Sequence, residues 1–136
     1  MDPTKKFAND KTTGSESLLS FDELPKWLQS NAYIQKGYRR PQNSWSGCVR
    51  SLYKYLHNET VNIHSHLWGA IVFLFLLFQR WCSPSNHETV TWHDPAGFGV
   101  FLAAAVFCMG ASALFHTANC HSPMVSGDLA AFADRY

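Results

Sequence analysis

The second part of this 136-residue chain carries very little charge. Nine of the eleven Lys and Arg residues and six of the ten acids lie in residues 1–60, so residues 61–136 carry only Arg80, Arg135 and four acids. The formal net charge of the whole chain is +1, without the concentrated basic face that a nucleic-acid-binding protein requires. We therefore expect no nucleic-acid partner, and a change of character near Thr60.

The sequence also lacks the short motifs that identify several classes of soluble enzyme. It contains no Gly-rich phosphate loop, no GxSxG nucleophile elbow and no CxxC pair. It has instead two long apolar runs, one within the uncharged residues 60–79 and one within the uncharged residues 95–127. About 20 apolar residues in a helix match the roughly 30 Å hydrocarbon core of a bilayer.

These runs predict two transmembrane helices, at about residues 60–80 and 96–117. Both runs are apolar on all sides, whereas a surface helix of a soluble protein has a polar face. The alternative is that they are core helices of a soluble domain, but 136 residues are too few to cover two such helices with polar surface. A signal peptide does not fit, because the first run begins far from the N-terminus.

The distribution of positive charge predicts the orientation of the chain. Residues 36–54 contain five basic residues, whereas the connection between the two runs carries only Arg80. The positive-inside rule therefore places the N-terminus in the cytoplasm. We expect an integral, multi-pass membrane protein.

With this orientation the cysteines have no disulfide partner. Cys48 and Cys120 would lie near the cytoplasmic face, Cys108 within the bilayer and Cys82 alone on the far side. Since no two of them share an oxidising compartment, we expect all four to be free thiols.

The segment before the membrane is expected to hold a tail followed by short helices. Residues 1–17 are polar without an apolar period, which predicts a disordered tail. Residues 18–59 are assigned to cytoplasmic or interfacial helices. Ser20 and Glu23 have the spacing of a capping box, which predicts that one short helix starts there.

A second helix is predicted from Ser44 to His57. Its apolar residues recur at intervals of three and four, while Arg50 and Lys54 project from another side. Such a helix can lie in the membrane interface, with its basic groups reaching the head groups of anionic lipids. It can equally pack against other helices of the same protein. The apolar residues are Trp45, Cys48, Val49, Leu52, Tyr53 and Leu56.

The histidines are the first candidates for chemistry. His57, His87 and His93 have polar neighbours in the sequence and are expected to be solvated. His64 and His66 are two residues apart, so they point to different sides of a helix, and we expect them to form hydrogen bonds at the membrane boundary rather than to share a metal.

Ser112 and His116 form a more specific pair. They are four residues apart, hence on one face of an otherwise apolar helix. A polar pair that faces the interior of a helix bundle usually marks a functional site in a membrane protein. One histidine does not make a zinc site, however, since catalytic zinc takes three protein ligands and a water.

Several blocks of sequence resemble the progestin and adipoQ receptor family, which includes adiponectin receptors and haemolysin III-related proteins. The resemblance covers about residues 18–136, in order and at the expected spacings. The blocks are Leu24–Leu28, Tyr33–Ile34, Gly37–Arg39, His57–Leu67, Ser112–Thr117 and Cys120–Ser122.

The resemblance implies an all-α membrane protein of seven helices with a cytoplasmic N-terminus. This chain would supply two transmembrane helices and the start of a third, at about residue 122, within a partial transmembrane domain at residues 60–136. It also implies a zinc site in which His116 is one ligand and two further histidines come from a last helix that this chain does not contain. Ser112 matches the serine that accompanies that histidine. The family Asp falls at Ala133, which makes Asp134 the nearest candidate for a group that holds the zinc-bound water.

Three hypotheses about function follow from the resemblance. The first is a zinc-dependent lipid amide hydrolase of the ceramidase type, with Ser112 and Asp134 in catalytic roles and a sphingolipid or ceramide-like substrate in the membrane. The second is a non-catalytic receptor, or a regulator of lipid or zinc homeostasis, whose output passes through cytoplasmic partners of residues 1–57. The third is an inactive truncated form, since only one of three zinc ligands is present.

Overall fold

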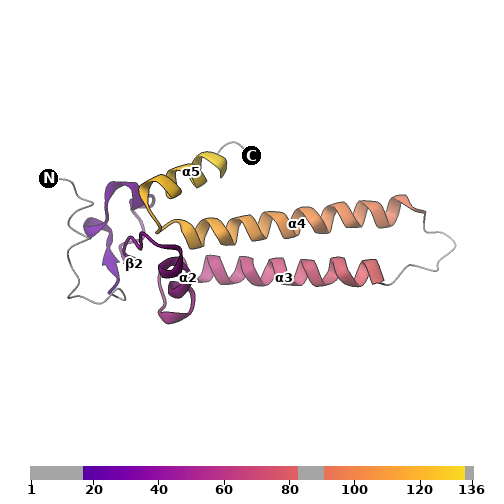
Figure 1. Cartoon of the computed structure of the whole chain (residues 1–136), viewed down its shortest axis with the longest axis horizontal. Helices are drawn as coiled ribbons and strands as arrows, with labels where there is room; N and C mark the ends of the chain where they lie inside the picture. Colours follow the sequence, from indigo (N-terminus) through magenta and orange to yellow (C-terminus); the bar gives the residue numbers. More distant parts are fainter. Residues whose placement is uncertain (1–16, 83–90, 134–136) are drawn as a thin grey trace. The chain divides into compact units, whose positions relative to one another are not determined.

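The computed structural model describes residues 17–82 and 91–133. Its elements are β1 (Leu19–Ser20), the 3-10 helices η1 (Phe21–Glu23) and η2 (Lys26–Leu28), β2 (Lys36–Tyr38), α2 (Trp45–Lys54), α3 (Thr60–Cys82), α4 (His93–Ala118) and α5 (Pro123–Ala133) (Figure 1). They form two compact units. The N-terminal unit combines the residues up to Val61 with those from Phe115 onward, and the helical unit comprises Asn62–Leu114.

The helical unit is built from the long parts of α3 and α4, which run side by side in opposite directions (Figure 1). The two helices have 23 and 26 residues and are apolar enough to cross a membrane. Both are longer than the about 20 residues that a bilayer core requires. The predicted spans, 60–80 and 96–117, fall inside them.

Large apolar side chains cover the outer surface of the helical unit. Soluble proteins rarely expose so large a contiguous apolar surface to water. Such a surface indicates contact with lipid or with further protein. The exposed aromatic side chains are Trp68, Phe75, Phe78, Trp81, Trp92, Phe98, Phe101 and Phe107. The surface therefore agrees with membrane insertion.

A glycine allows the two long helices to approach closely. A Cβ added at Gly69 on α3 would lie 3.4 Å from the Sδ atom of Met109 on α4, so the thioether packs directly over the glycine. Small residues at such contacts are the usual means of helix association in membranes, where the packing of side chains replaces the hydrophobic effect.

The start of α4 is fixed by a side chain of its first turn. The Asp94 carboxylate accepts hydrogen bonds from the backbone N–H of Thr91 at 2.9 Å and from its hydroxyl at 3.0 Å. Pro95 follows in the same turn, where its missing N–H costs nothing. An acidic residue here also interacts favourably with the positive end of the helix dipole.

The N-terminal unit has a small apolar core of its own. Leu19, Leu24, Leu28 and Tyr38 are buried together, with Phe21 and Trp27 packed against them. Burial raises the pKa of the Tyr38 phenol, and the Glu59 carboxylate raises it further. The protonated phenol shares its single hydroxyl hydrogen between the carbonyl oxygens of Asn31 and Ile34, each at 3.0 Å.

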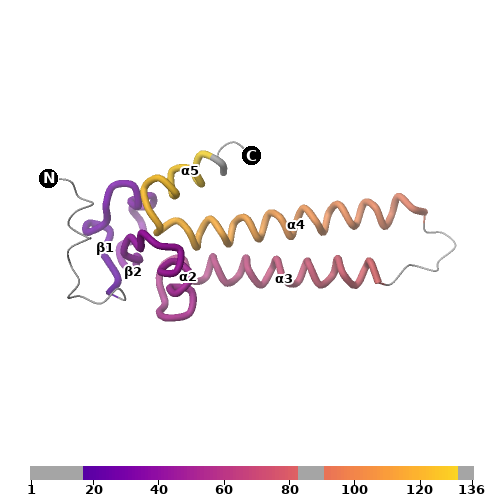
Figure 2. Tube along the Cα trace, in the orientation of Figure 1, coloured from indigo at the N-terminus to yellow at the C-terminus, as the bar shows by residue number. Residues whose placement is uncertain are grey.

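The assignment of residues 18–59 to cytoplasmic or interfacial helices does not include a small sheet that the structure contains. β1 and β2 lie side by side (Figure 2). They form a two-stranded antiparallel sheet in which Leu19 pairs with Tyr38 and Ser20 with Lys36. Leu19 and Tyr38 are buried, and their backbone groups need hydrogen-bond partners that no helix supplies. Gly37 has a φ of 90° within β2, a conformation that favours glycine.

The helix predicted at Ser20 is present only as a short turn. The Glu23 carboxylate accepts from the backbone N–H of Ser20 at 2.8 Å and from its hydroxyl at 2.7 Å, as the capping-box spacing predicts. The turn then ends, because Leu24, which precedes Pro25, is extended, as residues before proline usually are.

The helix predicted at 44–57 is observed as α2, and it ends three residues early at Lys54. The Ser44 hydroxyl caps it by accepting from the backbone N–H of Gly47 at 3.1 Å. Residues 55–57 instead belong to the connection between α2 and α3, which contributes to the site described next.

Candidate functional site

The C-terminal end of α4 is held by a buried arginine. Arg39 is only 4% exposed, and its guanidinium donates to the carbonyl oxygen of His116 at 2.5 Å, to that of Thr117 at 3.2 Å and to the Ser51 hydroxyl at 3.0 Å. The last carbonyls of a helix have no partner within the helix, and a cation is favourable at that end. Arg39 thus fixes the backbone of His116 itself.

The side chain of His116 is held by a carboxylate. Its Nδ1 lies 2.8 Å from Oε2 of Glu59, as an ion pair when the imidazole is protonated and as a hydrogen bond when it is neutral. Since a carboxylate only accepts, Nδ1 carries the proton, and the nitrogen that could ligate a metal is Nε2. Both residues belong to the N-terminal unit.

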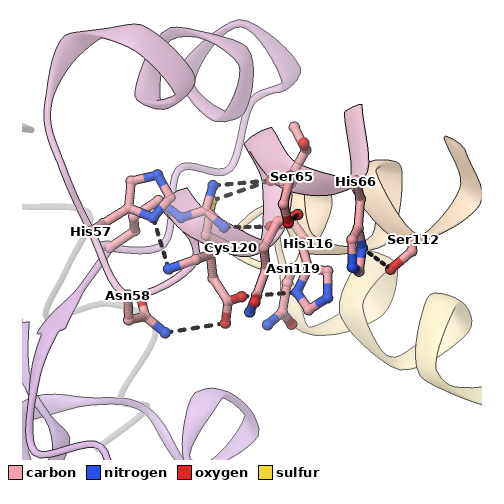
Figure 3. A network of polar contacts seen from close by, with 12 residues as sticks. His57, Asn58, Ser65, His66, Ser112, His116, Asn119 and Cys120 are labelled. Carbon is pink, nitrogen blue, oxygen red and sulfur yellow. Dashed lines mark hydrogen bonds and ion pairs between the residues drawn. The ribbon is translucent and has the colours of Figure 1, made fainter. Parts of the chain in front are cut away.

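A tight turn before α3 positions Glu59. The Thr60 hydroxyl accepts from the backbone N–H of His57 at 2.8 Å, and Nδ1 of His57 accepts from the backbone N–H of Glu59 at 3.2 Å. The Asn58 side-chain amide donates to Oε1 of Glu59 at 3.1 Å (Figure 3). The carboxylate is therefore held at both oxygens before any ligand is present.

The expectation that His57 is solvated is wrong. Its side chain is buried and meets the ring of Tyr55 edge-on, with centroids 5.9 Å apart. Its polar neighbours Asn58 and Glu59 are only half-buried, and the backbone N–H of Glu59 donates to Nδ1 of His57 within the turn.

A second polar pair lies within the helical unit. Nδ1 of His66 on α3 and the Ser112 hydroxyl on α4 share a hydrogen bond of 2.7 Å (Figure 3). The prediction that His66 forms a hydrogen bond is thereby confirmed. The partner could not be foreseen, because α3 and α4 are separated in the sequence and their register depends on packing.

We expect His66 and Ser112 to be energetically coupled. In a double-mutant cycle of His66→Ala and Ser112→Ala, the coupling energy should be about 0.6–2 kcal/mol, the range of hydrogen bonds between helices in membranes. The measurement is thermal unfolding of the four chains in one detergent. Ser65→Ala with Ser112→Ala is the control cycle, because the Ser65 hydroxyl donates to the carbonyl of Asn62 within α3. Equal coupling in both cycles would contradict a specific His66–Ser112 bond.

Two cysteines form a buried contact beside this site. The Sγ atoms of Cys48 on α2 and Cys120 lie 3.6 Å apart, and both side chains are buried. The contact with Cys120 and burial both raise the pKa of the Cys48 thiol above its ordinary value. All four cysteines are free thiols in the structure, and the sequence did not indicate that two of them would meet.

The structure describes two of the three predicted site residues. His116 and Ser112 both lie on α4, each with a hydrogen-bond partner from an earlier part of the chain. Asp134 lies outside the described residues. Within residues 17–82 and 91–133, no three His, Cys, Asp or Glu side chains come together as a metal site. A zinc ion at His116 would therefore need ligands from outside the described residues.

Sequence reasoning missed Glu59 and Arg39 as parts of the site. The sequence places Glu59 only within the His57–Leu67 block, and Arg39 only within the Gly37–Arg39 block and among the basic residues of 36–54. The single available signal was that both belong to blocks that resemble one family, since neither contact could be read from spacing along the chain.

Comparison with known proteins shows the family of the chain. The family model described as haemolysin-III related matches residues 54–134. The chain is 41% identical over 105 residues to the progestin and adipoQ receptor-like protein 1 of Caenorhabditis elegans, covering 77% of this chain and 24% of that protein. It is 34% identical over 118 residues to the adiponectin receptor protein of Drosophila melanogaster, covering 87% and 26%. It is 33% identical over 119 residues to the heptahelical transmembrane protein 1 of Arabidopsis thaliana, covering 82% and 35%.

The chain belongs to the haemolysin-III-related family, and the resemblance to progestin and adipoQ receptors is confirmed. It is a receptor-like integral membrane protein with two helices able to span the bilayer. It spans about a quarter to a third of the length of these relatives.

Proposed function

We propose that this chain forms the first part of a seven-helix membrane protein that hydrolyses a lipid amide of the ceramide type with the help of zinc. The observation that carries the proposal is the bond between His116 and Glu59. Histidines that ligate metals almost always donate their other ring nitrogen to a carboxylate, a carbonyl or a water. His116 fits this pattern, with Nε2 as the ligating atom.

When bound in such a site, zinc polarises a carbonyl group and makes water nucleophilic near neutral pH. The residues of this chain prepare the site. Glu59 fixes the tautomer and the ring orientation of His116, while Arg39 fixes its backbone. Ser112 presents a hydroxyl one helical turn before His116, from where it would orient the substrate carbonyl. In this proposal Asp134 holds the attacking water as a general base.

The remaining zinc ligands would come from helices outside this segment. The N-terminal unit would face the cytoplasm, as the charge distribution predicts, and its surface would be available to cytoplasmic partners. The substrate would reach the site from the surrounding lipid.

A receptor without catalysis is the second candidate. The names of two relatives, a progestin and adipoQ receptor-like protein and an adiponectin receptor protein, favour it. In that case the zinc would be structural, and His116 with Glu59 would hold helices together. Both candidates require His116 to ligate zinc, and they differ only in turnover.

The experiment that separates them uses a protein of the relatives' full length that carries this segment. Its zinc content is measured by elemental analysis, and its turnover is measured on a ceramide in mixed micelles. Zinc with turnover supports the hydrolase, whereas zinc without turnover supports the receptor. A protein without zinc, or with turnover insensitive to chelators, would refute the zinc-dependent proposal.

Glu59→Gln in the same full-length protein should weaken zinc binding by about 10–100-fold, the usual cost of losing an outer partner of a metal-ligating histidine. The amide has nearly the same shape but loses the charge that holds the Nδ1 proton. Zinc affinity is measured by competition with a chromogenic chelator. Glu23→Gln is the matched control, because this carboxylate accepts from the backbone N–H of Ser20, outside the site. Equal affinities in both variants would contradict the role of Glu59.

A further inference from the structure

The surface of α2 divides into three sectors. Successive residues of an α-helix are about 100° apart. Cys48 and Ser51 therefore fall on one side, Trp45, Val49 and Tyr53 fall together on the next, and Arg50 and Lys54 fall on a third. The sequence pattern alone grouped Cys48 with Trp45 and Val49, and the structure separates them.

The first sector packs against the rest of the N-terminal unit. Cys48 is fully buried against Cys120, and Ser51 is buried where its hydroxyl accepts from Arg39 and donates to the carbonyl of Cys48 at 2.7 Å. This sector is complete, with every polar group paired. Packing within the unit therefore does not account for the apolar side chains on the rest of the surface of α2.

The second sector is apolar and exposed. Trp45 is 53% exposed although its ring lies 4.6 Å from that of His121, Val49 is 49% exposed and Tyr53 is 72% exposed. Leu56, just past the end of the helix, is also exposed. Tryptophan and tyrosine are the residues enriched where protein meets the interface of a membrane, because each joins an apolar body to a polar group.

The third sector is basic. Arg50 and Lys54 are both exposed and border the apolar sector on the side away from the packed sector. Their positions would bring the two cations to the level of the head groups if the apolar sector entered the boundary of the acyl chains. No acidic residue occurs within α2.

The position of α2 in the chain supplies a further constraint. Lys54 precedes Thr60, where the membrane-spanning α3 begins, by six residues. Six residues reach at most about 20 Å when fully extended. The exposed sectors of α2 are therefore tethered within a short distance of the membrane surface.

We propose that α2 docks on the surface of an anionic bilayer, with Trp45, Val49 and Tyr53 inserted at the boundary of the acyl chains and Arg50 and Lys54 bound to lipid phosphate or carboxylate groups. The packed sector with Cys48 and Ser51 then couples the lipid surface to the segment that carries Arg39 and the end of α4. Exposed tryptophan and tyrosine beside two cations, on a helix six residues from the membrane-spanning α3, favour an anionic lipid surface over a second protein segment. The inference stands independently of zinc and of hydrolysis.

The test uses the full 136-residue chain reconstituted in vesicles of phosphatidylcholine, with and without phosphatidylserine. A photoreactive benzoylphenylalanine replaces Tyr53 in one chain and Tyr33 in another. Tyr33 is the matched control, because it is a tyrosine of the same unit that is 96% exposed and lies outside α2. Adducts with lipid are counted by mass spectrometry after illumination, and circular dichroism confirms equal helix content.

The expected result is a several-fold excess of lipid adducts at position 53 over position 33 in vesicles that contain phosphatidylserine. Arg50→Gln and Lys54→Gln should each reduce this excess, by up to about fivefold, as for basic residues close to an anionic surface. Equal lipid adducts at both positions would overturn the proposal. Cross-links from position 53 to protein instead of lipid would also overturn it. If the excess of lipid adducts did not change when phosphatidylserine was left out or when Arg50 or Lys54 was substituted, the preference for an anionic surface would be wrong.

Discussion

Replacing Arg39 by Met should lower the free energy of unfolding of the N-terminal unit by about 3 kcal/mol or more. The guanidinium is buried and serves three acceptors, the carbonyls of His116 and Thr117 and the hydroxyl of Ser51. Each buried polar group left without a partner costs about 1–3 kcal/mol. Methionine fills much of the volume but restores none of these bonds. The measurement is thermal or urea unfolding of the purified chain in detergent, followed by circular dichroism.

Arg40→Met is the matched control for Arg39→Met. Arg40 is half-buried and donates to the hydroxyl of Ser17 at 2.8 Å near the edge of the described segment. Because water can reach the groups of a half-buried contact once it is lost, Arg40→Met should cost less than Arg39→Met. Arg39→Lys should fall between the two, because it keeps the charge but cannot serve three acceptors in a plane. Similar losses of unfolding free energy in Arg39→Met and Arg40→Met would show that the bonds from Arg39 to the end of α4 contribute nothing specific.

Replacing His116 by Ala in a protein of the relatives' full length should abolish both zinc binding and turnover of a ceramide. Loss of an outer partner alone costs about 10–100-fold in metal affinity, and loss of the ligand itself should cost more. Zinc content is measured by elemental analysis, and turnover is measured by the fatty acid released. The first readout does not depend on whether the protein is an enzyme or a receptor.

His93→Ala controls for the removal of a histidine from the same helix. His93 is exposed at the first residue of α4, at the opposite end from His116, and its loss should leave zinc content and turnover unchanged. Thermal unfolding of each variant separates loss of zinc from loss of fold. If His116→Ala kept normal zinc content and normal hydrolysis, the assignment of His116 as a ligand would be wrong.

Sequence reasoning located the long helices because their signal is local. A charge-free apolar run the length of a bilayer needs no knowledge of tertiary contacts, and α3 and α4 contain the predicted spans. The same holds for the start of α2, since the cap at Ser44 acts within three residues. The two-stranded sheet escaped prediction because Leu19 and Tyr38 pair across a stretch of irregular turns.

The site was predictable only in part, for the same reason. Helical spacing placed Ser112 and His116 on one face of α4, but each takes its partner from a distant segment, His66 on α3 and Glu59 before it. Such contacts depend on the register in which separate segments pack, and the pattern within a single helix does not predict that register. A residue such as Arg39, whose role is to satisfy the carbonyls of another element, leaves no periodic trace at all.

The hydrogen bonds from Arg39 to the end of α4 also constrain the order in which the chain can fold. Arg39 meets its carbonyl partners 77 and 78 residues further along, and the backbone N–H groups of Gln42 and Asn43 donate to the carbonyls of Cys120 and His121, each at 2.8 Å. Contacts this distant in sequence form late, because the intervening loop must close first. During synthesis, the N-terminal unit therefore stays incomplete until both long helices have been made and the residues after α4 have emerged. The segment that is synthesised first is thus completed only by the part of the chain that follows the helical hairpin.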